Sequence, residues 1–259
     1  MAPNDPNARF GRDRRVAPRS PKPSPDEIRA QRKRDVALGY RLMAVQQWGD
    51  TGDGHISARD PEREDCFWLL RDEVSFHEAT TSDLVLVGPQ GQIVEGEGSI
   101  NRTAYYIHHP ILAARPEIVS AAHTHTGWGT PFSAERRAIL PITQESCVFF
   151  EDHALFDDDE VQIQSPDGGH RIAAALGENR AVILCNHGLL TVGTCVPESV
   201  GSFIMMERVC EAQMKARNAR PIPAEAARHA KSDLLRLGAG KISFRSMVAR
   251  HIGDPKNAE

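Results

Sequence analysis

Apolar and polar positions along the chain follow two periods, and each period predicts its own set of elements. Short apolar runs bounded by glycine, proline or charged residues predict strands. These runs lie at 55–59, 67–70, 83–87, 92–95, 118–125, 146–151 and 181–186. Helical spacing and helix-start signals predict helices at 25–47, 102–114, 133–140, 169–177 and 197–215. Strands that alternate with helices favour a layered α/β domain.

Local signals sharpen several of these elements. Ser24 is a good N-cap, Pro25 suits the first helical position, and Asp26 and Glu27 place acids in the first turn. The runs 55–59 and 67–70 are expected to pair. The runs 83–87 and 92–95, joined around Gly88-Pro-Gln-Gly91, are expected to form a hairpin.

Composition narrows the class of protein. At 259 residues and 40% hydrophobic residues the chain can bury a full core. No apolar run reaches the length of a membrane span, and the N-terminus lacks the apolar stretch of a signal peptide. A net charge of −4 gives no basic footprint for nucleic acid. Five scattered cysteines predict no disulfide framework, which favours a reducing, cytoplasmic environment. Together with the apolar runs and the net charge, this predicts a protein without membrane or nucleic-acid partners.

Charge and proline divide the chain into three predicted regions. Residues 1–24 are rich in proline and arginine and predict a disordered basic arm. This arm is either solvated or binds a neighbouring subunit or an acidic partner. Residues 25–250 are expected to form one domain, and 251–259 a C-terminal tail.

Three histidines follow predicted strands in a pattern typical of a metal site. His123 and His125 end the strand 118–125, and alternation places both on one face. His187 lies just past the strand 181–186, where Gly188 permits a sharp turn. Three imidazoles that converge at strand ends would form an open metal site of the catalytic type. The alternative is three ordinary histidines at a wet sheet edge.

The surrounding motifs resemble the class II aldolase/adducin superfamily from about residue 35 to 215, and more weakly to about 250. They are Gly54–Arg59, Ser82–Leu86, Gly91–Gly96, Ile107–Pro116, Ala122–His125, Pro141–Gln144, Asn186–Leu190 and Glu207–Gln213. The resemblance implies a three-layer α/β/α fold with a central, mainly antiparallel sheet and a homotetramer of such domains. It also implies one divalent metal per chain, held by His123, His125 and His187.

One departure from the aldolase pattern bears on the chemistry. The aldolases place a glutamate four residues before the histidine that His108 matches, and this position is Ala104 here. An aldolase needs that base beside its metal, because the metal polarises the carbonyl while the base moves the proton. The asparagine of the aldolases' glycine-rich phosphate loop is His55 here. Ordinary aldol cleavage of a sugar phosphate is therefore not expected.

Three neutral ligands leave positions open for a chelating 2-oxo acid and for dioxygen, and imidazole suits Fe(II) as well as Zn(II). One branch of the superfamily, the oxygenases of the novobiocin and clorobiocin pathways, oxidatively decarboxylates a prenylated 4-hydroxyphenylpyruvate. We therefore expect an Fe(II)- or Zn(II)-dependent decarboxylase or oxygenase acting on a small aromatic 2-oxo acid. The alternatives are an aldolase-type lyase with a relocated base, and a non-catalytic binding module like the adducin heads.

Six further residues are candidates for the site. His55, Tyr105 and Glu145 are expected to be catalytic, with Glu145 supplying the missing acid from a new direction. Arg59 and Arg102 could hold a substrate carboxylate by paired hydrogen bonds, and Trp128 could line an aromatic pocket. Each has a structural alternative: surface ion pairs for the arginines, and core packing for the aromatic residues.

Overall fold

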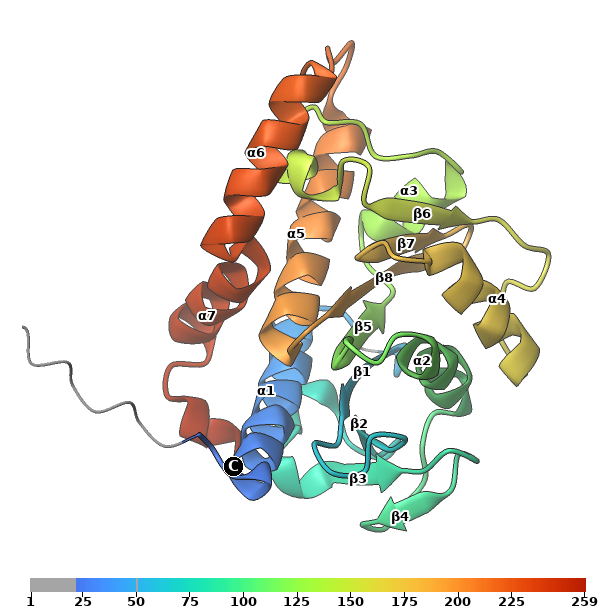
Figure 1. Ribbon diagram of the computed structural model, residues 1–259, viewed down its shortest axis with the longest axis vertical. Helices are drawn as coiled ribbons and strands as arrows, with labels where there is room; N and C mark the ends of the chain where they lie inside the picture. The colour runs from blue at the N-terminus through green and yellow to red at the C-terminus, as the bar shows by residue number, and fades with distance from the viewer. Residues whose placement is uncertain (1–21, 50) are drawn as a thin grey trace, which may run out of the picture.

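The computed structural model describes residues 22–49 and 51–259, so most of the predicted arm 1–24 lies outside the described residues. One eight-stranded sheet runs through the molecule in the order β4-β3-β2-β1-β5-β8-β7-β6 (Figure 1). The strands are β1 (Gly54–Arg59), β2 (Phe67–Leu70), β3 (Leu84–Val87), β4 (Ile93–Glu95), β5 (Ser120–Thr124), β6 (His153–Phe156), β7 (Ala181–Leu184) and β8 (Gly188–Gly193). Neighbouring strands are antiparallel except for the parallel pair β6–β7, which confirms a mainly antiparallel sheet.

Helices cover both faces of this sheet. One face carries α1 (Pro25–Val45), α5 (Val196–Lys215), α6 (Ala224–Leu237) and α7 (Ala239–His251) (Figure 1). The other carries α2 (Arg102–Ala114) and α4 (Pro166–Leu176), while the short α3 (Gly129–Ala134) contacts β8 and α5. Four 3-10 turns complete the elements: η1 (Phe76–Glu78), η2 (Thr81–Asp83), η3 (Glu145–Phe149) and η4 (Pro255–Ala258). The expected three-layer α/β/α fold is confirmed.

Each face of the sheet has its own apolar core. Leu42, Ile56 and Phe203 belong to the core under α1 and α5. Ile107 and Ile172 belong to the core under α2 and α4. Alternation along β1 and β5 thus sends even-numbered residues toward the first core and odd-numbered ones toward α2.

Two local features position α2 above the sheet. Asn101 caps its first turn, because its side-chain oxygen accepts hydrogen bonds from the backbone N–H groups of Thr103 and Ala104. Gly169 lets α4 pack closely against it, since a Cβ there would lie 1.7 Å from the carbonyl oxygen of Tyr106. The cap and the close contact with α4 therefore fix the position of α2 above β1.

Most predicted elements are confirmed, including the capped first helix, the β1–β2 pair and the β3–β4 hairpin. The predicted helix 133–140 is wrong, because the helix is α3 and the chain leaves it at Arg136, whose φ is 48°. The predicted strand 146–151 is also wrong. Ser146 and Thr143 hydrogen-bond each other's backbone and start the 3-10 turn η3 instead.

Several elements had no sequence prediction. The run 181–193 contains two strands, of which only the first was predicted, and the C-terminal helices α6 and α7 were not predicted either. Two further findings concern the cysteines and the helices. All five cysteines are free, which confirms the absence of a disulfide framework. Among the described residues, no helix is both long enough and apolar enough to cross a membrane.

Candidate metal centre

Three histidines meet where β5 and the β7–β8 turn come together. His123 is near the end of β5, His125 follows it, and His187 lies in the turn between β7 and β8. One ligand atom from each ring lies within 4.8 Å of the other two. The turn is held by Asn186, with φ of 62°, and Gly188, with φ of 157°. The β5–β8 pairing thus brings together histidines that lie 62 to 64 residues apart in the sequence.

The partners of these rings fit metal binding. Nδ1 of His123 donates to the carbonyl oxygen of Leu189 at 2.7 Å, and Nδ1 of His125 lies 3.0 Å from a carboxylate oxygen of Asp53. The backbone of Val161 hydrogen-bonds His187. With Nδ1 donating, Nε2 of His123 and His125 keeps the lone pair that a metal needs. The three histidines are therefore suited to hold a divalent ion.

Two of the three histidines, His123 and His187, are held in the neutral form. Burial, followed by the neighbouring His187, His55 and His125, lowers the pKa of His123 well below its usual value. Burial and His125 lower the pKa of His187 to about 4. Neutral imidazole is the ligand form, so protons compete little with a metal near neutral pH.

The three rings open into a cavity of about 500 Å³. Its other described lining residues are Gly52, Asp53, Gly54, His55, Asn101, Thr103, Thr130, Val161, Gln162 and Asn186. Asp53 is the one carboxylate among these described residues, and it pairs with His125. The cavity therefore combines a three-nitrogen centre with walls whose one described carboxylate already has a partner.

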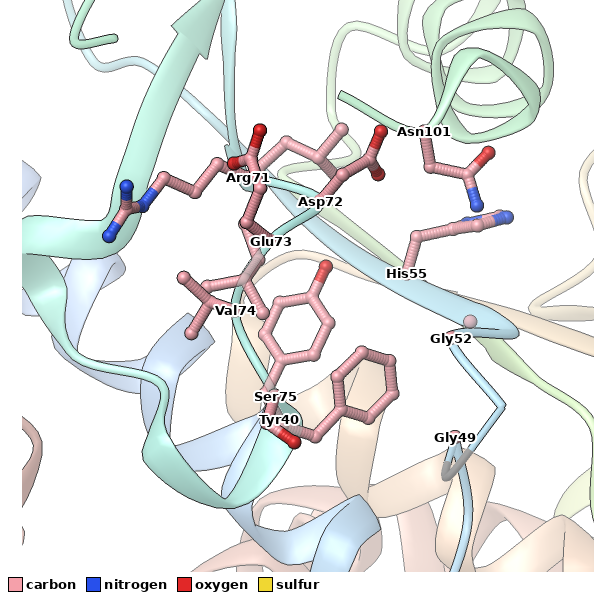
Figure 2. A pocket seen from close by; sticks show the side chains of 14 residues that line it. Tyr40, Gly49, Gly52, His55, Arg71, Asp72, Glu73, Val74, Ser75 and Asn101 are labelled. Carbon is pink, nitrogen blue, oxygen red and sulfur yellow. The ribbon is translucent and has the colours of Figure 1, made fainter. Parts of the chain in front are cut away.

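Figure 2 shows the side chains that line a second cavity, of about 270 Å³. The two cavities share His55, Asn101 and two glycines. The charged residues that line the second cavity are Arg71, Asp72 and Glu73.

His55, which was predicted to be catalytic, lines the metal cavity. It is 3% exposed, lies directly opposite His123 in the β1–β5 register, and has its ring centroid 4.9 Å from that of His123. Its Nδ1 lies 2.8 Å from Nε2 of His108. His55 is not among the three converging ligand residues, so it stands beside the candidate centre.

Arg59 lies at the opposite end of β1. Its guanidinium donates to backbone carbonyl oxygens of four residues: Glu64, Leu112, Arg115 and Ile118. These bonds tie β1 to the end of α2 and to the start of β5. The structure thus assigns Arg59 a partner set other than a substrate carboxylate.

Arg102 and Tyr105 hold the hairpin loop against α2. Arg102 donates to the carbonyl oxygen of Gly91 at 3.0 Å, and the Tyr105 hydroxyl donates to that of Pro89 at 2.8 Å. Neither is among the residues that line the metal cavity. Their predicted roles in substrate binding and catalysis have no support from this geometry.

Trp128 and Glu145 also lie away from the cavity lining. The ammonium of Lys215 sits 4.7 Å from the Trp128 ring centroid, an arrangement typical of a cation–π contact. Glu145 lines a different cavity, together with Thr143 and Arg208. Within one chain, Glu145 is thus not placed to replace the missing aldolase glutamate.

Two acidic residues of the site had no sequence prediction. Asp53 orients His125, and its position just before Gly54 in a glycine-rich loop was the available signal. Glu207 is buried in α5 and accepts hydrogen bonds from the loop that follows His125: from Thr126 Oγ1 and the backbone N–H groups of Trp128 and Gly129. Glu207 begins the family motif Glu207–Gln213, but its hydrogen-bond partners are 78 to 81 residues away in the sequence.

Comparison with known proteins gives relatives of several kinds. A 4-hydroxy-3-prenylphenylpyruvate oxygenase/4-hydroxy-3-prenylbenzoate synthase of Streptomyces roseochromogenus subsp. oscitans is 39% identical over 207 residues, covering 78% of this chain and 75% of that protein. The decarboxylase NovR of Streptomyces niveus is also 39% identical, over 78% of this chain and 77% of its own.

The fold has close structural counterparts. The L-fuculose 1-phosphate aldolase from Glaciozyma antarctica PI12 superposes with a TM-score of 0.80 and is 32% identical, covering 89% of this chain and 94% of that one. The family described as class II aldolase and adducin N-terminal domain matches residues 34–214. These residues include all three converging histidines. This chain belongs to the class II aldolase and adducin N-terminal domain family.

Proposed function

We propose that this chain is a metal-dependent enzyme that oxidatively decarboxylates a small aromatic 2-oxo acid, such as a prenylated 4-hydroxyphenylpyruvate. The observation that carries the proposal is the three-histidine cluster in a cavity whose one described carboxylate is already paired with His125. Relatives named as an oxygenase and a decarboxylase, each 39% identical, support it.

Each residue of the proposed centre has a distinct task. His123, His125 and His187 would hold one Fe(II) or Zn(II) per chain, while Asp53 and the Leu189 carbonyl fix the first two rings. The bound metal would supply a Lewis acid for the 2-oxo-carboxylate and, if it is iron, activation of dioxygen. Asp53, the one described carboxylate of the lining, is already paired with His125, which reduces its competition with a substrate carboxylate.

The same assembly as in the aldolases is proposed for this chain, a homotetramer. Light scattering of the purified protein tests this directly. A monomer would remove the assembly from the proposal without affecting the chemistry of the cavity.

An aldolase-type lyase is the second candidate, favoured by the 32% identity to an L-fuculose 1-phosphate aldolase. Its base would have to come from outside the metal cavity. Asp72 lines the adjoining cavity, and burial together with the neighbouring Glu73 raises its pKa. An adducin-like binding module is the third candidate, but such a module has no use for three converging histidines.

Oxygen uptake by the Fe(II)-reconstituted chain tests the proposal. The substrates are plain and prenylated 4-hydroxyphenylpyruvates, and released carbon dioxide is followed in parallel. Coupled uptake and release is the expected result, and the Zn(II)-loaded chain is the matched control that should take up no oxygen. Carbon dioxide without oxygen uptake would indicate a simple decarboxylase. Silence on both, with one metal per chain, would contradict the proposal and favour the lyase.

A further inference from the structure

A chain of three buried polar side chains runs from the sheet to the wall of the metal cavity. Ser57 Oγ lies 2.7 Å from His108 Nδ1, and His108 Nε2 lies 2.8 Å from His55 Nδ1. Ser57 and His108 are 0% exposed, and His55 is 3% exposed. Water therefore cannot exchange for any of these partners.

The hydrogen bonds along this chain have one direction that satisfies all three groups. The Ser57 hydroxyl has one hydrogen and, among the described residues, one partner, so it donates to Nδ1 of His108. His108 then carries its proton on Nε2 and donates to Nδ1 of His55. The opposite direction would leave the buried hydroxyl hydrogen without an acceptor, which is unfavourable for a polar group shielded from water.

This direction decides which proton His55 offers to the cavity. Because Nδ1 of His55 accepts, the ring proton is on Nε2. No described residue hydrogen-bonds that nitrogen, and His55 lines both cavities. His55 thus presents a neutral N–H donor beside the metal ligands instead of a lone pair.

Asn101 presents a second donor at the same wall. Its side-chain oxygen is committed to the backbone N–H groups of Thr103 and Ala104, so its amide nitrogen is the group left over. Figure 2 shows this nitrogen directed toward the His55 ring. No described residue accepts a hydrogen bond from it, and Asn101 also lines both cavities.

Two N–H donors without protein acceptors call for an acceptor from a ligand. Asp72 and Glu73 line the adjoining cavity, and Asp53, the one described carboxylate in the lining of the metal cavity, is paired with His125. A metal with open positions and two neutral donors together suit an oxygen that carries negative charge.

We propose that His55 and Asn101 form a donor pair that binds a carboxylate oxygen of the metal-chelated substrate, and that Ser57 acts through His108 to hold His55 as the donor. The substrate class, a 2-oxo acid, rests on the function proposed above. Ser57 and His108 are positioning residues, since neither is among the residues that line the metal cavity.

The tautomers are measured by 15N NMR of the histidine-labelled, Zn(II)-loaded full chain. Two-bond ring correlations show which nitrogen carries the proton, and His55→Asn and His108→Asn identify the two signals. Nε2–H on both His55 and His108 is the expected result. Nδ1–H on His55 would overturn the proposal, because His55 would then offer a lone pair to the cavity.

Oxalate, which mimics a 2-oxo acid, serves as the probe for anion binding to the Zn(II)-loaded chain by calorimetry. Asn101→Asp keeps the capping oxygen of α2 but replaces the donor with an acceptor, so oxalate affinity should fall roughly ten-fold or more. Ser57→Ala frees His108 to reverse its tautomer and should weaken oxalate in the same direction. The matched control is Ser120→Ala, which removes another buried hydroxyl, one bonded to Ser199, and should leave oxalate affinity unchanged.

Metal stoichiometry and thermal stability are measured for each variant beside its oxalate titration. A variant that has lost its metal or its fold is then recognised. Unchanged oxalate affinity in both Asn101→Asp and Ser57→Ala would overturn the donor pair. Loss of affinity in Ser57→Ala with the wild-type His55 tautomer would overturn the role of Ser57. Oxygen uptake is independent of these readouts. If it fails while tautomers and oxalate behave as expected, the proposed function is wrong and the donor pair stands.

Discussion

The two ends of strand β1 are both polar and buried, yet they are built differently. At one end, Asp60 follows the strand with its side chain 0% exposed and accepts five hydrogen bonds: two from Arg29, one from Trp68, and one each from the backbone of Glu62 and Arg63. At the other end, His55 and the facing His123 open into the metal cavity. The strand therefore joins two polar clusters. The cluster around Asp60 is closed to the metal cavity, and the cluster around His55 and His123 is open to it.

The difference lies in how much hydrogen-bonding capacity each cluster has left. Around Asp60 and Arg59 the side chains are bonded to other parts of the same chain. Around His55 and Asn101, donors remain that no described residue accepts from. Unused capacity in a concave, buried place is what distinguishes a binding site from a structural network. Polarity or burial alone does not separate the two.

The largest effect is expected at the open end. His123→Ala removes one of three ligands, so the purified protein should lose its metal and its activity should fall to background. Metal analysis and the oxygen-uptake assay measure this. His153→Ala is the matched control, because that ring serves the backbone of Phe149 and Ile139 and should leave metal content unchanged. Full activity in His123→Ala would mean that the three histidines are not the centre.

The closed end should respond in stability instead of chemistry. Asp60→Asn places an amide N–H₂ among five donors and removes the buried one of the three carboxylates that Arg29 contacts, which should cost about 1–3 kcal/mol in the free energy of unfolding. Chemical denaturation measures this cost. Metal affinity of the folded fraction should stay the same. A large drop in metal affinity with unchanged stability would break the comparison between the two ends.

The stability that the Asp60 cluster contributes should depend on pH. Burial alone would raise the pKa of Asp60, but the hydrogen bonds from Arg29, the backbone and Trp68 hold it below its usual value. A carboxyl whose folded pKa is lowered stabilises the fold above its unfolded pKa of about 3.9, and this contribution is lost as pH falls toward the folded pKa. The stability difference between wild type and Asp60→Asn should therefore shrink below about pH 4. A difference that stays constant to low pH would contradict this assignment.

An intermediate effect is expected from the residue that orients a ligand. Asp53→Ala removes the carboxylate that holds His125, and metal affinity should fall by about 10- to 100-fold. Competition with a chelator measures the affinity. Asp72→Ala removes a carboxylate from the adjoining cavity and should leave metal affinity within about two-fold, since Asp72 lies outside the metal cavity lining. Equal losses in both variants would show that general charge, and not orientation, matters.

The open cluster was predictable where a short motif carries it. His123 and His125 share a strand, and His187 follows another, so local pattern was enough to bring them together. Asp53 lies in a glycine-rich loop and Glu207 in a family motif, but their partners are distant in sequence, as in the His108–His55 bond, and no local pattern encodes those pairings. The wrong helix 133–140 failed for the same reason, because Asn186 of the distant turn hydrogen-bonds the backbone of Ser133.

The roles of arginines are the hardest to predict from sequence. The same guanidinium can bind a substrate carboxylate in an open site or donate hydrogen bonds within a closed structural network. Arg59 ends the motif Gly54–Arg59, and nothing in the local sequence shows that its guanidinium donates hydrogen bonds to carbonyl oxygens. Its environment differs from that of His55 in that the donors already have acceptors. The difference is visible only in the folded chain.

The smallest effect is expected from Arg59→Lys. Lysine keeps the charge but cannot reach four carbonyl oxygens at once, so the free energy of unfolding should fall by about 1–2 kcal/mol. The KM for a 2-oxo acid should stay within about two-fold, because these donors are already used within the chain. Denaturation and steady-state kinetics measure the two effects on the same preparation. A KM raised ten-fold with unchanged stability would place Arg59 in the open cluster after all, since the guanidinium would then have to leave its carbonyl partners to bind the substrate carboxylate.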